Sequence, residues 1–110
     1  MIFVVVKFPV RPEKAQEWEP LALQYARDAN SEEGCVFYDW HRSVDDPNEW
    51  VCTEAFRDQD AAVAHVNTAH FKTFILEQAQ DLVSAQPKII NTTIDQYGWG
   101  AMGEVQPRTA

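Results

Sequence analysis

The order of apolar and polar residues divides the chain into short strands and amphipathic helices. Residues 2–8 (IFVVVKF) are almost continuously apolar and β-branched, which is typical of a strand in the middle of a sheet with both faces covered. From Pro12 to about residue 30 the apolar positions recur at helical spacing, which predicts an amphipathic helix. Pro20 lies inside it, and because the apolar stripe keeps its phase there, we expect a kink and not a break.

Residues 35–43 and 49–56 are rich in Val, Phe, Tyr and Trp, and they are separated by the turn residues Asp45-Asp46-Pro47-Asn48. They are predicted to form a β-hairpin, preceded by a turn in which Gly34 is free to adopt positive φ. Because alternate residues of a strand point to the same face, Tyr38 and Trp40 share one face of the first strand. Trp50, Cys52, Glu54 and Phe56 share one face of the second strand. The loop does not fix the register, so the pattern leaves open whether these faces share a side of the sheet.

After the hairpin, the pattern predicts two helical pieces and a last strand. Asp58 is a favourable N-cap for the first piece, which carries His65, and Thr68 is placed to cap the second. The second piece has an apolar stripe at helical spacing: Phe71, Phe74, Ile75, Leu82 and Val83. Residues 88–97 (KIINTTIDQY) are predicted to be the last strand.

The predicted order of elements is β-α-β-β-α(α)-β, which defines a ferredoxin-like α+β domain with helices on one face of an antiparallel sheet. The opposite face would carry Val, Phe, Trp and Ile side chains, and such a face is rarely exposed in a soluble monomer. A second copy packed against it would cover it, which predicts a homodimer. We place this domain at residues 1–97 and a tail at residues 98–110, where Trp99 and Met102 are candidates for contact with the partner subunit.

Composition narrows the classes of partner. The chain has 110 residues, with 9 basic and 17 acidic residues, for a net charge of -8. This acidic balance argues against nucleic acid and against an anionic membrane surface as partners. The two cysteines, Cys35 and Cys52, are too few for a disulfide framework and are expected to be reduced. The apolar run at residues 2–6 has no basic segment before it, so we expect a cytoplasmic protein without a secretory signal.

The segment from residue 54 to residue 74 gathers the candidate chemistry of the chain. His65 and His70 lie there among aromatic residues, and Glu54 ends the preceding strand. Titratable imidazoles in aromatic surroundings suit a small apolar pocket, so these three residues are the acid–base candidates. The candidate pocket walls are aromatic: Tyr38, Trp40, Phe56, Phe71 and Phe74.

Each of these residues also has a structural interpretation. His70 could cap a helix, Glu54 could pair with a basic residue across the sheet, and Tyr38 and Trp40 could pack in the core. A zinc site formed by His65, His70 and Glu54 is disfavoured, because two histidines five residues apart are poorly spaced as ligands on one helix. We therefore expect no metal.

The same residues resemble a known family. The pattern contains Glu33-Gly34-Cys35, Tyr38, the acidic loop at residues 45–48, Glu54, Asp58, His65 and His70-Phe71-Lys72. Together they resemble the antibiotic biosynthesis monooxygenase superfamily, in particular its quinol-monooxygenase-like branch, over roughly residues 2–95. The resemblance implies a dimeric α+β barrel with a pocket in each subunit between sheet and helices.

The resemblance also implies an activity, which is the oxidation of dihydroxyaromatics or polyketide phenols by molecular oxygen without metal, flavin or haem. The haem-degrading branch of the superfamily has Asn, Trp and a haem-ligating His at positions that here hold Val5, His65 and Ile75, so haem is disfavoured. We expect a cofactor-independent monooxygenase that binds a small aromatic substrate and oxygen. The alternatives are an isomerase of the same fold, acting on a small carbonyl or phosphorylated substrate, and a non-catalytic dimeric ligand-binding module.

Overall fold

The computed structural model describes residues 1–109, and residue 110, the last of the predicted tail, lies outside the described residues. Its sheet contains β1 (Ile2–Pro9), β2 (Cys35–Arg42), β3 (Glu49–Phe56) and β4 (Lys88–Thr93). The strands lie in the order β2-β3-β1-β4, and each neighbouring pair is antiparallel. The central position predicted for β1 is confirmed, while β4 is shorter than predicted and ends at Thr93.

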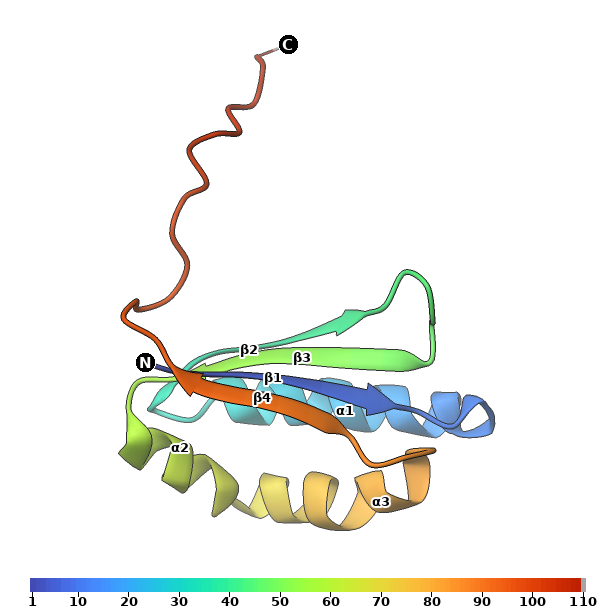
Figure 1. The fold of residues 1–110 in the computed structure, drawn as a ribbon. Helices are drawn as coiled ribbons and strands as arrows, with labels where there is room; N and C mark the ends of the chain where they lie inside the picture. The colour runs from blue at the N-terminus through green and yellow to red at the C-terminus, as the bar shows by residue number, and fades with distance from the viewer. Residues whose placement is uncertain (110) are drawn as a thin grey trace.

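All helices lie on one face of this sheet, and the other face is open (Figure 1). A short turn of 3-10 helix, η1 (Pro12–Lys14), leads into α1 (Ala15–Asn30), and α2 (Gln59–Val66) follows the hairpin. The next helical segment comprises the π-helical η2 (Phe71–Gln78) and the single turn α3 (Ala79–Leu82). The observed order of elements and the one-sided packing confirm the predicted ferredoxin-like α+β fold.

Helix α1 is held to the sheet by a stripe of fully buried side chains: Trp18, Ala22, Tyr25 and Ala29. Their spacing of four, three and four residues places them on one side of the helix. Pro20 lies on the exposed side, and the helix continues through it. At the centre of the core the Trp18 ring packs against four other rings, which belong to Phe8, Trp40, Trp50 and Phe74.

The register of the hairpin resolves the question that alternation left open. Tyr38 is paired with Glu54, and Trp40 is paired with Cys52. Directly opposite residues in antiparallel strands point to the same face. The alternating residues that include Tyr38 and those that include Glu54 therefore both lie on the helix side of the sheet. A bulge between Cys35 and Phe37 interrupts the pairing at the start of β2.

The turn before the hairpin differs from the prediction. Gly34 does not adopt positive φ; among the described residues only Gly98 does. Instead, Gly34 lies against the first turn of α2, where a Cβ atom would come within 2.3 Å of the Ala61 Cβ. Glycine is needed here because a helix approaches the backbone closely.

The open face of the sheet carries half-buried apolar side chains: Phe3, Val5, Phe37 and Val51. In the single chain only the helix face of β1 is covered, so coverage of its other face stays a prediction that depends on a partner copy. The strand tryptophans all point into the core, whereas Trp99 of the tail lies against Phe37 with ring centroids 5.3 Å apart. Beyond this contact the tail extends away from the side of the sheet that carries the helices (Figure 1).

Candidate functional site

A cavity of about 480 Å³ lies between the sheet and the helices that follow the hairpin. Its walls are mostly apolar and come from β1, β3, β4, α2 and η2, and they include Val4, Phe56, Val63, Phe71, Ile75 and Ile89. The lining residues with polar side chains are Tyr25, Tyr38, Glu54, Gln59, His65, Gln86 and Asn91. An apolar cavity with a few convergent polar groups is the usual form of a small-molecule site.

His65 is the best-anchored polar residue of this cavity. Its side chain projects from α2, is 4% exposed, and packs against the rings of Phe56 and Phe71. Its Nδ1 lies 2.8 Å from a carboxylate oxygen of Glu32, and its Nε2 lies 3.0 Å from the hydroxyl oxygen of Tyr25. Every hydrogen-bonding atom of this buried imidazole therefore has a partner.

These partners determine which nitrogen carries the proton. A carboxylate can only accept, so the His65 Nδ1 donates its hydrogen to Glu32. Burial, followed by the nearby Glu54 and Glu32 charges, raises the pKa of Tyr25, so its hydroxyl keeps its proton and donates it to Nε2. The lone pair of Nε2 is thus directed at a group that also lines the cavity, and a substrate hydroxyl could replace Tyr25 as its donor.

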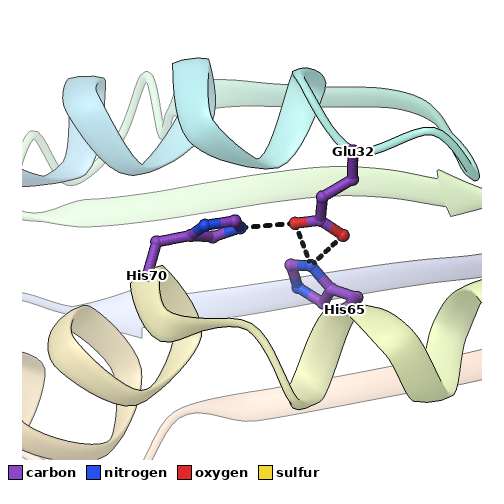
Figure 2. A group of neighbouring side chains, drawn as sticks. All are labelled: Glu32, His65 and His70. Atoms are coloured by element: carbon purple, nitrogen blue, oxygen red, sulfur yellow. Dashed lines mark hydrogen bonds and ion pairs between the residues drawn. The ribbon is translucent and has the colours of Figure 1, made fainter.

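Glu32 also contacts the second candidate histidine, as Figure 2 shows. The Nε2 of His70 lies 2.5 Å from Glu32 Oε2, so the carboxylate lies between the two imidazoles. Glu32 comes from the turn after α1, His65 from α2, and His70 from the start of the next helical segment. Thr68 joins those segments, since its hydroxyl donates to the His65 carbonyl and accepts from the Phe71 amide.

Glu54 lies in the same cavity but does not hydrogen-bond to His65. Its Oε1 is 3.7 Å from the His65 Nε2, and its Oε2 accepts from the Cys52 thiol at 3.1 Å. The carboxylate that hydrogen-bonds to His65 is that of Glu32 and not that of Glu54. Burial raises the pKa of Glu54 above its ordinary value of 4.5, which favours the protonated carboxyl, a potential hydrogen-bond donor.

The raised pKa of Glu54 predicts how stability depends on pH. The folded protein holds this proton to a higher pH than the unfolded chain does, so between the two pKa values it binds more protons. The contribution of Glu54 to the free energy of unfolding is therefore complete below pH 4.5 and is lost as pH rises through the folded pKa. Replacing Glu54 with glutamine should make the fall in stability between pH 4.5 and neutral pH shallower.

Urea denaturation of wild type and Glu54→Gln across this range measures the difference between their slopes. Glu104→Gln, in the exposed tail, is the matched control and should follow the wild type. Parallel curves for wild type and Glu54→Gln would contradict the burial argument.

The remaining predicted residues fall into two groups. Tyr38, Phe56 and Phe71 line the cavity. Trp40 and Phe74 are not among its lining residues; both pack on Trp18 in the aromatic core. His70 is not among the lining residues; it contacts the cavity residues indirectly, through its hydrogen bond to Glu32 and the packing of its ring on Tyr25.

Sequence reasoning missed Tyr25 and Glu32. Tyr25 belongs to the apolar stripe of α1, and its spacing does not distinguish a core tyrosine from one whose hydroxyl is used. Glu32 precedes the Glu33-Gly34-Cys35 element and looks like any acidic turn residue. The available signal was that Glu32 is adjacent to a recognised motif.

The ligand atoms of Glu32, His65 and His70 all lie within 4.8 Å of one another, so this trio is the set that could hold a metal ion. It differs from the set weighed from the sequence, because Glu32 takes the place of Glu54. The Glu32 carboxylate occupies the space between the two nitrogens and is hydrogen-bonded to both. The three side chains already satisfy one another by hydrogen bonds, and an ion would have to replace the two imidazole hydrogens that point at the carboxylate.

The fold and site define a small α+β protein with one antiparallel sheet and an apolar cavity containing a buried histidine. The family model described as antibiotic biosynthesis monooxygenase matches residues 1–76, and the chain belongs to this family. A relative from Bacillus subtilis, named "Putative monooxygenase YcnE", is 30% identical over 96 residues, covering 87% of this chain and 100% of the relative.

Solved structures agree on the fold. A crystal structure described as an antibiotic biosynthesis monooxygenase superposes with a TM-score of 0.81 at 21% identity, covering 87% of this chain and 100% of that chain. A conserved protein from Methanosarcina mazei Go1 superposes with a TM-score of 0.77 at 27% identity, covering 83% and 89% of the two chains. Among residues 1–109, no helix has the length and apolar character needed to cross a membrane.

Proposed function

We propose that this protein is a monooxygenase that oxidises a quinol or a polycyclic phenol with molecular oxygen and needs no cofactor. The observation that carries this proposal is the His65 Nε2, held 3.0 Å from the Tyr25 hydroxyl at an apolar cavity. Family membership and the name of the Bacillus subtilis relative support an oxygenase. The quinol or phenol class of substrate rests on the chemistry of the cavity.

Oxygen reacts slowly with neutral closed-shell phenols, so the reaction requires a phenolate. A phenol with a pKa near 10 is ionised in roughly one molecule in a thousand at pH 7, and making the anion dominant costs about 4 kcal/mol. A neutral histidine is a suitable base because its ordinary pKa lies close to that of the solution. Tyr25 and Glu54 both line the cavity; burial raises the pKa of each, which favours the protonated form that could donate a hydrogen bond to the phenolate oxygen.

The overall reaction balances without an added reductant. One molecule of hydroquinone and one of oxygen yield one molecule of hydroxybenzoquinone and one of water, since one oxygen atom enters the ring and the other is reduced. The substrate supplies both electron pairs, two of its hydrogens end in the water, and the imidazolium of His65 returns its proton to the reduced oxygen. The apolar walls exclude bulk water from the phenolate.

Removing the base should abolish most of the oxygen consumption. Oxygen uptake with a panel of quinols is expected to fall by about 10²- to 10⁴-fold in His65→Ala, the range typical of general-base catalysis. We expect a smaller fall for His70→Ala, because His70 contacts Glu32 and not the cavity. His41→Gln is the matched control, since His41 is exposed and bonded to Thr53 away from the cavity. Unchanged uptake in both alanine variants would refute the proposal.

The same experiment separates the alternatives. None of the residues lining the cavity is Lys or Arg, so a phosphorylated substrate of an isomerase would lack a positive partner there. A quinol that raises the melting temperature without oxygen uptake or chemical change would indicate a binding module.

We also propose that two copies pack through their open sheet faces. Such an interface would cover the half-buried apolar side chains Phe3, Val5, Phe37 and Val51. Replacing Val5 with glutamate would bury an unpaired carboxylate in it and should shift the protein from dimer to monomer in sedimentation velocity at micromolar concentration. Val44→Glu is the control, because Val44 is fully exposed in the hairpin loop. A wild-type monomer would contradict this proposal.

The tail from residue 98 is a candidate for a further contact with the partner. Trp99 lies on Phe37 at the open face, and Met102 is exposed. Limited proteolysis that removes the tail should loosen the dimer if this contact forms.

A further inference from the structure

We propose that Glu32 is a positioning residue, which fixes the tautomer of His65 and stabilises its protonated form, and that His70 holds Glu32 in place for this task. The expected effect of Glu32 on oxygen uptake rests on the proposed function. The position of the hydrogen on His65 does not depend on that function. Neither Glu32 nor its bridge to His70 is part of the residue pattern by which the sequence resembles its family.

The first step concerns which nitrogen of His65 is basic. A neutral imidazole has one N–H and one lone pair, and the hydrogen bond at one nitrogen determines which group the other presents. Glu32 accepts from Nδ1 with both oxygens, at 2.8 and 3.0 Å. This bond places the hydrogen on Nδ1 and leaves the lone pair on Nε2, the nitrogen that faces the Tyr25 hydroxyl.

The second step concerns the charged intermediate. When Nε2 takes a proton from a substrate hydroxyl, His65 becomes an imidazolium although its side chain is only 4% exposed. A buried cation is costly without a counter-charge, and the Glu32 carboxylate supplies one on the far side of the ring. Glu54 is less suited to this role, because burial raises its pKa and favours its neutral form.

The third step concerns what fixes Glu32 itself. Its backbone lies in a turn, and an unrestrained glutamate side chain there would occupy several rotamers. The His70 Nε2 donates to Glu32 Oε2 at 2.5 Å, which leaves the carboxylate held between two imidazoles (Figure 2). The exposed fraction of the side chain rises from 4% at His65 to 13% at Glu32 and 21% at His70, so the trio leads from the cavity to the surface.

The substitution Glu32→Gln separates positioning from charge. Its amide oxygen can still accept from His65 Nδ1 and its amide nitrogen is neutral, so the tautomer should be kept while the counter-charge is lost. Glu32→Leu removes both. Glu33→Gln is the matched control, since Glu33 is the next residue of the same turn and its side chain is 95% exposed.

The tautomer is measured without substrate, by ¹⁵N NMR of imidazole-labelled protein. We expect His65 to carry its proton on Nδ1 in wild type, Glu33→Gln and Glu32→Gln, and to lose this preference in Glu32→Leu. A wild-type His65 protonated on Nε2, or an unchanged Nδ1 preference in Glu32→Leu, would overturn the assignment. Circular dichroism establishes that each variant is folded, and Glu32→Asp provides a second variant that keeps the charge if Glu32→Leu does not fold.

Oxygen uptake then tests the charge. Glu32→Gln should lower kcat by about 10- to 100-fold with little change in KM, because hydrogen bonds to charged groups contribute more than neutral ones and this charge forms only after proton transfer. His70→Gln retains a donor for Glu32 and should stay closer to wild type than His70→Leu. An unchanged kcat in Glu32→Gln would overturn the stabilising role. If wild type shows no uptake with any quinol, the proposed function fails while the NMR result still decides the positioning role.

Discussion

Replacing Trp18 with alanine is expected to lower the free energy of unfolding by about 3–5 kcal/mol, the cost typical of a large-to-small substitution at a buried aromatic residue. The Trp18 side chain is 0% exposed and lies between four rings from β1, β2, β3 and η2. Its removal would leave a cavity at the point where helices and sheet meet. Urea denaturation monitored by circular dichroism measures the loss.

Two further variants sharpen this prediction. The Nε1 of Trp18 has no hydrogen-bond partner among the described residues, so Trp18→Phe removes an unsatisfied buried donor along with part of the ring. It should therefore cost clearly less than Trp18→Ala. Trp99→Ala is the matched control, because this ring is 75% exposed and should change stability little. Equal losses in Trp18→Ala and Trp99→Ala would contradict the described core.

Replacing Gly34 with alanine is expected to lower both stability and activity. The added methyl group would lie 2.3 Å from the Ala61 Cβ and 3.2 Å from the Ala61 Cα, so α2 must move away from the turn. Overpacking of this kind costs about 1–3 kcal/mol. Because Glu32 lies in that turn and His65 on that helix, the movement should also lengthen their hydrogen bond and reduce oxygen uptake.

The contact partner of Gly34 provides a test of this cause. In the double variant Gly34→Ala/Ala61→Gly the closest clash is removed, so uptake should recover, although glycine in the helix costs about 1 kcal/mol of stability. Gly103→Ala is the control, since a Cβ at Gly103 meets nothing within 4 Å. If Gly34→Ala alone retained wild-type stability and uptake, the close approach of α2 would be refuted.

Much of the fold could be predicted because local patterns carry it. Each local pattern predicts one element: the continuous apolar run predicts β1, the apolar stripe predicts α1, and the turn residues predict the hairpin. Where the prediction failed, contacts between elements far apart in the sequence decided the structure. Residues 94–97 continue the polar and apolar pattern of the last strand, but β4 ends at Thr93. Ile94 still exchanges two backbone hydrogen bonds with Met1, each at 3.0 Å, and residues 95–97 lie beyond the residues that pair with β1.

The candidate site was predicted only in part for the same reason. His65 and the aromatic residues near it were identifiable, because they follow one another along one segment. Tyr25 is 40 residues from His65 in the sequence, and Glu32 is 33 residues away. No local pattern relates residues at such distances.

The amino-acid sequence by itself determined the elements of this protein, their order, the one-sided helical layer and the buried histidine segment, since hydrophobic periodicity acts over neighbouring residues. Only the tertiary structure decided which carboxylate holds His65. Glu32 is brought to the imidazole by the packing of α1 on the sheet and by the close approach of α2 to Gly34. Glu54, which the sequence grouped with His65 as an acid–base candidate, has its Oε1 3.7 Å from the His65 Nε2, and burial raises its pKa.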